Sequence, residues 1–527
     1  MKNTVVFLLT ILASILSAVF LILSFHPYNM GWLAWVALVP LLVAMSGRNV
    51  KVGFLLCCLC MMIFFGVVFG FTFQVSGYSI LHHTVLDVYL GCLCGLFGLG
   101  YSFLWRRWGG SVALFGAPFL WVCLEYIRGN FGMLAFPWVL LAYSQYTNLP
   151  AIQIASVAGS YGVSFLIVMV NAGIAAAILG IVGKIRREGS SVGRQARTTA
   201  MATVVLTAAV LFALSWSYGK QVIGGELSGR RVKVSLVQGN IEQHKKWDRR
   251  HAAYILETYS DLTAKVSKEK PDLIIWPETA TPRSITRDLS LRNRVGNIAR
   301  DSETCLLLGS AEHQKFEGKG AKDLKFHNSA FLFNPSEAAK NQHYEKMHLF
   351  PFGEYLPWKG IIPWSALNVP EVGNYVPGEK HTVFECGEFR FGVTICWEIL
   401  FPELVRIFVR DGAQAMVNIT NEAWFGKTVA PYLVVTGAVL RAVENRVFVA
   451  RCANTSMSCF IDPCGRILDR VKDEKGEELF VRGVLTGHVI PIDSKTIYTR
   501  FGNWLVWVSL AWMGIFLLGG FLRKESP

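Results

Sequence analysis

Eight apolar runs, separated by short polar segments, occupy the first 217 residues and the C-terminal end of the chain. They lie at 5–25, 31–45, 52–73, 86–104, 111–126, 161–182, 201–216 and 504–522. Most of them reach the roughly 17–25 residues that an α-helix needs to cross a bilayer core, although the second, fifth and seventh are shorter. The pattern predicts a membrane bundle of about eight transmembrane helices, seven of them before residue 218.

Between the last two runs lies a polar stretch in which short β-branched or aromatic segments alternate with helical patterns. The predicted strands are 232–237, 272–276, 304–308, 391–395, 415–419 and 447–451, and helices are predicted at 251–267 and 433–445. This is the size of one α/β domain. We therefore divide the chain into a membrane domain at 1–217, an α/β domain at 218–500, and a last transmembrane helix with a short tail at 501–527.

The net charge of +14 becomes informative once it is located along the chain. With the N-terminus in the cytoplasm, the segments on the cytoplasmic side contain twelve Lys or Arg and two Glu, so ten of these charges lie on one side. The short outer loops contain only Arg128. This asymmetry follows the positive-inside rule and gives no reason to expect nucleic acid as a partner.

The same orientation places both termini in the cytoplasm and residues 218–500 outside it, which in a bacterial inner membrane is the periplasm. An even number of spans before residue 218 would reverse this assignment. The pattern defines no oligomeric state.

Twelve cysteines are divided equally between the apolar runs and the polar stretch. Those in the apolar runs are small hydrophobic residues in the simplest interpretation. The six in the polar stretch show no CxxC or Cys/His spacing, so we expect neither a metal nor another cofactor. Cys396 should remain free. The other five are able to form disulfides in an oxidising compartment, but the sequence does not determine which of them pair. The five are Cys305, Cys386, Cys452, Cys459 and Cys464.

The strongest chemical signal is a predicted strand that ends on Cys396, followed by a helical segment at 402–410. A thiol at such a turn is exposed and has backbone N–H groups nearby for a developing oxyanion. It also needs a partner, because a free thiol is mostly protonated at neutral pH. Glu278, at the end of another strand, is a candidate base, and Lys346 is a candidate cation for the oxyanion. A Cys–His dyad with His327, His343 or His348 is the less favoured arrangement.

These residues together resemble the nitrilase (carbon–nitrogen hydrolase) superfamily over residues 231–491. The resemblance rests on Glu278 in WPE, Lys346 eight residues before Glu354, and Cys396 in CWE. The surrounding spans narrow it to the apolipoprotein N-acyltransferase family, a membrane-embedded branch, over essentially the whole chain. Segments 237–241 (VQGNI), 351–357 (PFGEYLP) and 421–426 (NEAWFG) are similar to that family as well.

The resemblance implies an αββα sandwich and the transfer of an acyl chain from a phospholipid to the amine of a diacylglyceryl-cysteine in an apolipoprotein, the last step of bacterial lipoprotein maturation. It implies Glu278 as general base, Lys346 as oxyanion stabiliser, Cys396 as the nucleophile that forms a thioester, and Glu354 as a supporting carboxylate. Trp247, Trp424 and Glu398 match positions associated with the site or its lipid-binding arms. Trp397 stands where many members carry Tyr, so a hydroxyl role at this position is lost.

Transfer rather than hydrolysis requires that water be kept from the thioester, which favours an aromatic-lined cleft. Phe352, Trp358 and Trp364 are candidates for its lining, and Trp247 and Trp424 are the preferred ones. Two alternatives stay open. A membrane-tethered amidase of the nitrilase type would turn over a small amide without lipid. A transporter or lipid-binding protein with an inactive domain would need charges inside the spans, where only Asp87 and Glu125 are found, near span ends.

Overall fold

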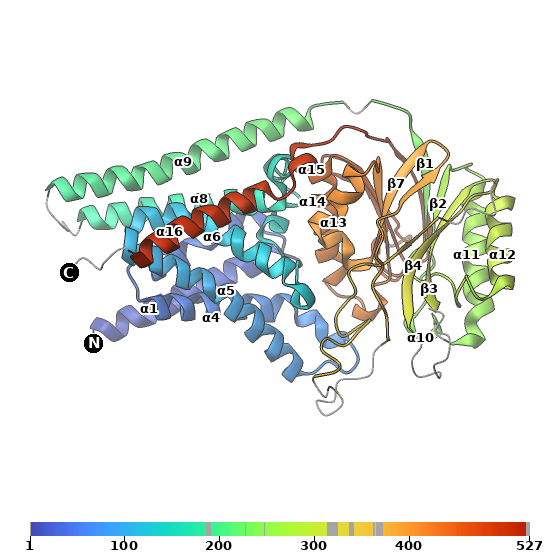
Figure 1. The fold of residues 1–527 in the computed structure, drawn as a ribbon, viewed down its shortest axis with the longest axis horizontal. Helices are drawn as coiled ribbons and strands as arrows, with labels where there is room; N and C mark the ends of the chain where they lie inside the picture. The colour runs from blue at the N-terminus through green and yellow to red at the C-terminus, as the bar shows by residue number, and fades with distance from the viewer. Residues whose placement is uncertain are drawn as a thin grey trace. The chain divides into compact units, whose positions relative to one another are not determined.

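A computed structural model describes residues 2–185, 191–226, 228–246, 248–313, 325–336, 342–361, 364 and 373–522. The chain forms two compact units (Figure 1). The first comprises residues 1–73, 78–225 and 501–527, and the second comprises residues 226–500 together with 74–77. Each unit is described by itself below.

The first unit is helical, and seven helices within its described residues are long and apolar enough to cross a membrane. They are α1 (Lys2–Ser24), α4 (Val50–Val68), α5 (Ile80–Trp108), α6 (Gly110–Asn130), α8 (Ala155–Ile185), α9 (Ser191–Ile223) and α16 (Trp504–Leu522). The predicted runs at 111–126 and 201–216 are parts of α6 and α9, so both reach spanning length. The predicted membrane bundle is confirmed with seven such helices.

The short second run, 31–45, is a broken segment made of η1 (Gly31–Leu33), α2 (Ala34–Ala37) and α3 (Val39–Met45). Polar side chains of neighbouring helices complete its backbone hydrogen bonds. Asn171 Oδ1 accepts from Leu38 N at 2.8 Å, and Ser17 Oγ accepts from Leu41 N at 2.9 Å. Unpaired backbone groups cost several kcal/mol in lipid, so these contacts explain how a broken helix is tolerated here.

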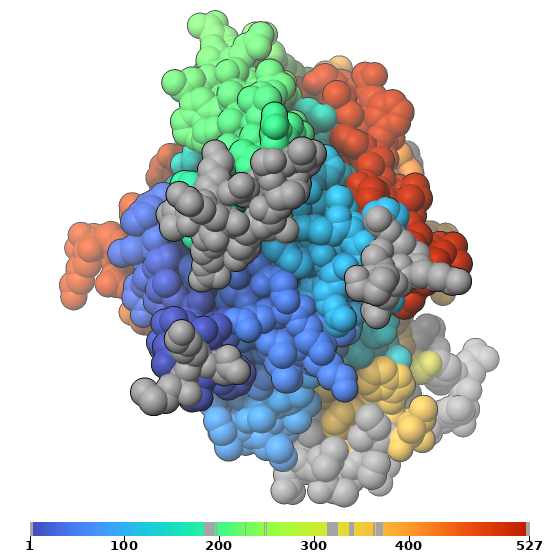
Figure 2. All heavy atoms as spheres, turned by 90° about the vertical axis from the view of Figure 1, so that its left-hand side faces the viewer, coloured from blue at the N-terminus to red at the C-terminus, as the bar shows by residue number. Residues whose placement is uncertain are grey.

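The directions of the helices show that the chain turns back within this segment. Helices α1 and α4 run the same way, because Ser14 Oγ bonds Leu56 O at 2.5 Å while Phe25 packs on Phe64 at the far ends. The chain must therefore return between them. Helix α1 begins and α16 ends at the same end of this unit (Figure 1), the end that faces the viewer in Figure 2. Trp108, the last residue of α5, bonds Phe516 O of α16 at 2.9 Å, so Arg106 and Arg107 also lie at this end.

The second unit contains two six-stranded sheets, in the orders β12-β1-β2-β3-β4-β5 and β11-β10-β9-β8-β7-β6. The first six strands of this unit in chain order are β1 (Val232–Gln238), β2 (Leu273–Ile275), β3 (Cys305–His313), β4 (Phe326–Phe333), β5 (Gln342–Glu345) and β6 (Val383–Cys386). The next six are β7 (Phe389–Ile395), β8 (Ala415–Thr420), β9 (Phe448–Ala453), β10 (Cys459–Ile461), β11 (Ile467–Arg470) and β12 (Gly483–Val489). Three neighbouring strands of each sheet are parallel, β1-β2-β3 and β7-β8-β9.

Helices cover the outer faces of both sheets, which gives the αββα sandwich expected from the sequence (Figure 1). Helices α11 (Ala252–Ser267) and α12 (Leu289–Asp301) lie on the first sheet, and α13 (Pro402–Arg410) and α14 (Ala430–Asn445) lie on the second. The short helices are α10 (Gln243–Lys246), η5 (Arg249–His251), η8 (Cys396–Leu400), η9 (Ala423–Phe425) and α15 (Ile497–Phe501).

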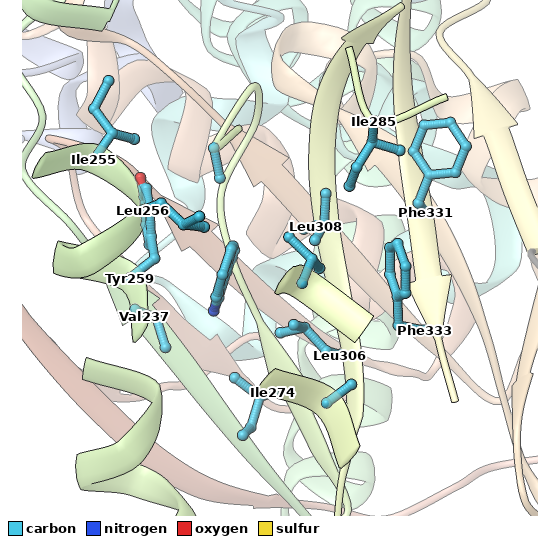
Figure 3. Close-up of a cluster of buried hydrophobic side chains, with 14 of the residues drawn as sticks. Val237, Ile255, Leu256, Tyr259, Ile274, Ile285, Leu306, Leu308, Phe331 and Phe333 are labelled. Atoms are coloured by element: carbon cyan, nitrogen blue, oxygen red, sulfur yellow. The ribbon is translucent and has the colours of Figure 1, made fainter. Parts of the chain in front are cut away.

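Apolar side chains fill the layer between α11, α12 and the first sheet (Figure 3). Tyr259 of α11 stacks on Trp276 with ring centroids 5.0 Å apart, and Leu306, Leu308 and Phe331 complete the layer from the strands. Burying one such aromatic or aliphatic side chain stabilises a fold by roughly 1.5–3 kcal/mol. This layer fixes the ends of β2 and β3.

One disulfide joins the two sheets, between Cys305 of β3 and Cys386 of β6. Cys452, Cys459 and Cys464, the other polar-stretch cysteines named above, are buried and outside any disulfide, and Cys396 is outside any disulfide as well.

The strand directions bring several chain segments to one edge of each sheet. Strand β5 is antiparallel to β4, which is antiparallel to β3, so β5 runs in the same direction as β2 and β3. Strands β7 and β8 are parallel as well. Because the carboxyl ends of parallel strands meet at one edge, the residues after β2 and β5 lie close together, as do those after β7 and β8.

Candidate active site

Cys396 directly follows β7 and begins η8, and its backbone is left-handed with φ +58°. This conformation costs a non-glycine residue roughly 1–2 kcal/mol, so the surroundings must impose it. Asn418 Nδ2 donates to Cys396 O at 3.0 Å, and Glu398 Oε2 accepts from Ile395 N at 2.8 Å. The turn is therefore held on both sides of the thiol, as expected of a nucleophile at a strand-to-helix turn.

Glu278 lies three residues after β2 and is buried. Its Oε1 accepts from Asn328 Nδ2 at 2.7 Å, and its Oε2 accepts from the backbone N of Asn421 at 2.7 Å. Lys346 Nζ lies 3.7 Å from Oε1. The carboxylate is fixed by the first sheet and by the segment after β8 of the second.

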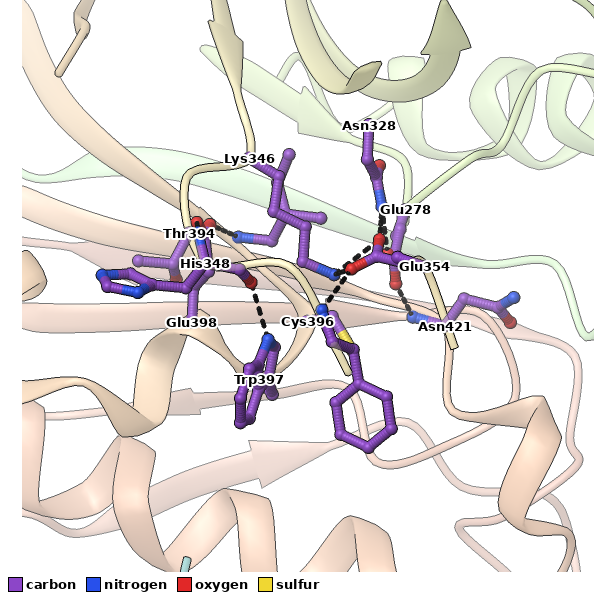
Figure 4. Close-up of polar contacts among 12 residues, drawn as sticks. Glu278, Asn328, Lys346, His348, Glu354, Thr394, Cys396, Trp397, Glu398 and Asn421 are labelled. Atoms are coloured by element: carbon purple, nitrogen blue, oxygen red, sulfur yellow. Dashed lines mark hydrogen bonds and ion pairs between the residues drawn. The ribbon is translucent and has the colours of Figure 1, made fainter. Parts of the chain in front are cut away.

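Lys346 follows β5 and is only 2% exposed. Its Nζ lies 2.9 Å from Glu354 Oε1 and 2.8 Å from Oε2, a closer pair than that with Glu278. Glu354 also accepts from Phe350 N at 2.7 Å through Oε2. Glu354 thus holds the ammonium between two carboxylates, and the residues lie together with Cys396 (Figure 4).

The electrostatics of the cluster follow from burial and from these charges. Burial, together with the negative charge of Glu278, raises the pKa of the Cys396 thiol, against the opposing effect of Lys346. Burial also raises the pKa of Glu278. For Lys346 burial favours the neutral amine, but Glu354 and Glu278 outweigh it and raise the pKa of the ammonium. The resting site therefore contains a protonated thiol, a basic carboxylate and a permanent cation.

Glu398, expected to match a position of the site or its lipid-binding arms, joins β5 and the residues after it to the end of β7 by its buried carboxylate (Figure 4). Its Oε1 accepts from Tyr344 Oη at 2.9 Å, Met347 N at 2.7 Å and His348 N at 3.0 Å, while Oε2 accepts from Ile395 N. Burial raises its pKa to about 7, against the lowering effect of these backbone donors. Glu398 ties the segment of Lys346 to the turn of Cys396.

Trp397 stands where many family members carry Tyr, so it has no hydroxyl to donate. Its side chain is buried, and its indole N–H donates a hydrogen bond instead. Its Nε1 donates to His348 O at 2.7 Å, and its ring packs edge-on against Phe350 and Phe401 at 5.1 and 4.9 Å. Trp397 therefore strengthens the same connection that Glu398 makes.

The aromatic residues that were predicted to line a cleft are mostly exposed. Trp424, in η9, is 51% exposed, and Phe352 is 49% exposed. Trp364 packs edge-on against Phe352 at 5.2 Å, and Trp358 is 37% exposed. Trp247 lies outside the described residues. These exposed rings are available to a ligand, and their role as a cleft lining remains a proposal.

Three contributors escaped the sequence analysis. Asn328 bridges the two carboxylates, since its Nδ2 also lies 2.9 Å from Glu354 Oε1. Asn421 belongs to segment 421–426, which was singled out only for its similarity to the family. It contributes a backbone N–H, which no side-chain pattern in the sequence reveals. Lys246, at the end of α10, donates from Nζ to Glu278 O at 2.9 Å. Asn328 lies in β4, a strand that was not predicted, so nothing pointed to it.

Comparison with known proteins agrees with this architecture. The family model for the apolipoprotein N-acyltransferase N-terminal domain matches residues 17–173, and that for carbon–nitrogen hydrolase matches residues 233–489. The apolipoprotein N-acyltransferase of Geobacter metallireducens is 35% identical over 522 residues, covering 98% of this chain and 96% of its own length. That of Chlorobaculum tepidum is 29% identical, covering 97% and 96%. Nit3 of Saccharomyces cerevisiae, of the nitrilase superfamily, has a TM-score of 0.37 at 23% identity, covering 50% of this chain and 92% of its own.

A bundle of membrane-crossing helices joined to a two-sheet carbon–nitrogen hydrolase unit defines a membrane-bound acyl-transferring branch of that superfamily. The chain belongs to the apolipoprotein N-acyltransferase family.

Proposed function

We propose that this enzyme transfers an acyl chain from a phospholipid, through a thioester on Cys396, to the N-terminal amine of the diacylglyceryl-cysteine of an apolipoprotein. The observation that supports it is the buried cluster in which Glu278, Lys346 and Glu354 meet beside the strained turn of Cys396. Family membership supplies the acceptor, and the membrane helices make a lipid donor accessible.

In the first half-reaction the Cys396 thiol gives its proton to Glu278, and the sulfur attacks the ester carbonyl carbon of the phospholipid. The ammonium of Lys346 stabilises the oxyanion of the tetrahedral intermediate. The ester C–O bond then breaks, and the lysophospholipid oxygen leaves with the proton from Glu278. The products are an acyl thioester on Cys396 and a lysophospholipid.

In the second half-reaction the neutral amine of the apolipoprotein attacks the thioester carbonyl and gives a proton to Glu278. The C–S bond breaks, and the departing thiolate takes up that proton. The product is an amide, and the resting thiol is restored. Both half-reactions use the same base and the same cation, which is why one cluster suffices for both.

The location proposed for this chemistry is the periplasmic side of a bacterial inner membrane. The basic ends of the helices support it, since Arg106 and Arg107 lie at the end of the first unit where α1 begins and α16 ends. We infer that both termini are cytoplasmic and that 31–45 is a further crossing, so that the chain crosses the membrane eight times. The catalytic part then corresponds to about 218–500.

Intact-mass spectrometry of the purified full chain with phospholipid alone tests the proposal. Wild type should gain one fatty-acyl mass, which an added lipopeptide amine removes, and Cys396→Ser should gain no alkali- or hydroxylamine-labile thioester. Release of ammonia from small amides without lipid, and without any acyl adduct, would support a membrane-tethered amidase instead.

A further inference from the structure

A second lysine lies beside the reacting groups and has no part in the mechanism above. Lys246, the last residue of α10, is 4% exposed. Its Nζ donates to the main-chain oxygen of Glu278 at 2.9 Å, so it contacts the residue that carries the base. An ammonium is rarely buried unless it is paired, and burial of this one costs free energy that a neutral side chain would avoid.

The charges around the thiol explain what this ammonium does. Glu278 and Glu354 carry two negative charges, and Lys346 carries one positive charge. Glu422 also acts on the thiol, but Arg451 pairs with it at 2.6 Å. Without Lys246 the cluster has an excess negative charge, which disfavours a thiolate. With Lys246 protonated the four charged groups balance.

We propose that Lys246 is a positioning residue of this site, whose ammonium, held by the Glu278 main chain, supplies the positive charge that favours the Cys396 thiolate. The inference rests on the proposed function insofar as Cys396 is the nucleophile. It does not depend on the identity of the acyl donor or of the acceptor.

The protonation of Lys246 gives the proposal a distinctive pH dependence. Burial lowers the pKa of Lys246 to about 7, while Glu278 and Cys396 oppose this shift. Lys246 is therefore charged below about pH 7 and largely neutral well above it. Loss of its charge should slow thiolate formation at low pH and matter little at high pH, whereas loss of a purely structural contact would act equally at all pH values.

The experiment follows alkylation of Cys396 by iodoacetamide in the detergent-solubilised full chain between pH 6 and pH 9, by mass spectrometry of the Cys396 peptide. Lys246→Met keeps an unbranched side chain that is one atom shorter, and it removes the ammonium. Lys245→Met is the matched control, because Lys245 is in the same helix but pairs with Glu242 at 2.7 Å near the surface.

We expect Lys246→Met to alkylate about tenfold more slowly than wild type at pH 6 and within about twofold of it at pH 9. Lys245→Met should match wild type throughout. An unchanged profile, or a pH-independent difference, for Lys246→Met would overturn the proposal.

If Lys246→Met fails to fold, Lys246→Arg is measured instead. Alkylation of this variant at the wild-type rate at pH 6 would support the role of the charge, and slower alkylation would overturn the proposal. A wild type that is not alkylated at Cys396 at any pH would contradict the proposed nucleophile rather than the role of Lys246.

Discussion

The carboxylate of Glu398 accepts four hydrogen bonds, from two segments of the chain that each carry a site residue: β5 with the residues after it, and the end of β7. All four partners are donors, so both oxygens must be acceptors. Glu398→Gln has the same shape but turns one acceptor into an N–H group that faces a donor. We expect it to cost about 1–3 kcal/mol of unfolding free energy and to slow thioester formation at least tenfold.

Thermal unfolding and the acyl-adduct assay measure the two effects of Glu398→Gln. Glu345→Gln is the control, because Glu345 is partly exposed and its contact is with His327 at 3.5 Å. Equal activity of the two variants would show that the Glu398 connection does not position the site.

Asn328 holds Glu278 and Glu354 through one amide group. Asn328→Leu leaves one oxygen of each carboxylate without this donor, so both carboxylates lose orientation, and the ionised form of the buried Glu278 becomes less stable. We expect thioester formation to fall about 10- to 100-fold with little change in the mass of acyl adduct finally reached. Single-turnover mass spectrometry separates the two quantities, and Asn334→Leu, just beyond the same strand, should behave like wild type.

At the scale of elements, the disulfide between β3 and β6 closes a loop of 81 residues within the second unit. Its removal in Cys305→Ser/Cys386→Ser should lower the unfolding free energy by about 2–4 kcal/mol, because the unfolded chain gains freedom. Cys305 begins β3 and Cys386 pairs with the first residue of β7, whereas Cys396 follows the other end of β7, so acyl transfer at 25 °C should persist. Thermal unfolding tests this against Cys464→Ser, which changes a buried cysteine outside the disulfide. Loss of activity without loss of stability would contradict the expectation.

The sequence predicted those elements whose pattern is local. The central strands β1, β2, β3, β7, β8 and β9 are rich in β-branched and other apolar residues because both faces are covered, and α13 matches its predicted segment 402–410. The remaining strands, β4 to β6 and β10 to β12, were not predicted. Strand β12, for example, pairs with β1 from about 250 residues away, and its half-exposed residues show no apolar run.

The sequence likewise predicted only a part of the candidate site. Glu278, Lys346 and Cys396 lie at strand ends, where a side-chain pattern is visible, and the structure brings them together. Asn421 acts through its backbone, and Lys246 belongs to a four-residue helix. Such contributions depend on tertiary contacts that no spacing in the sequence encodes.

At the scale of the whole molecule, the chemistry requires an acyl donor from the bilayer and an acceptor with a free amine. A second unit tethered between α9 and α16 has access to both only if it lies on the side where the acceptor is presented. The number of crossings before residue 226 decides that side. The proposed topology has seven, the six long helices and the segment 31–45, through which the chain returns between the parallel helices α1 and α4.

Reporter fusions test whether 31–45 crosses. If 31–45 crosses, green fluorescent protein fused after Gly47 fluoresces, because this position is cytoplasmic, and alkaline phosphatase fused after Glu226 is active, because that position is periplasmic. If 31–45 does not cross, Gly47 is periplasmic and Glu226 is cytoplasmic. The fluorescent protein after Gly47 is then dark, and the phosphatase after Glu226 is inactive. A fluorescent protein after Pro527 should fluoresce in the first case, since the arginines of α5 and the end of α16 lie together and the positive-inside rule favours the cytoplasm for them. Fluorescence at Gly47 combined with an inactive phosphatase at Glu226 would contradict the proposed topology even with 31–45 as a crossing, and the acyl transfer would then have to take place on the cytoplasmic face.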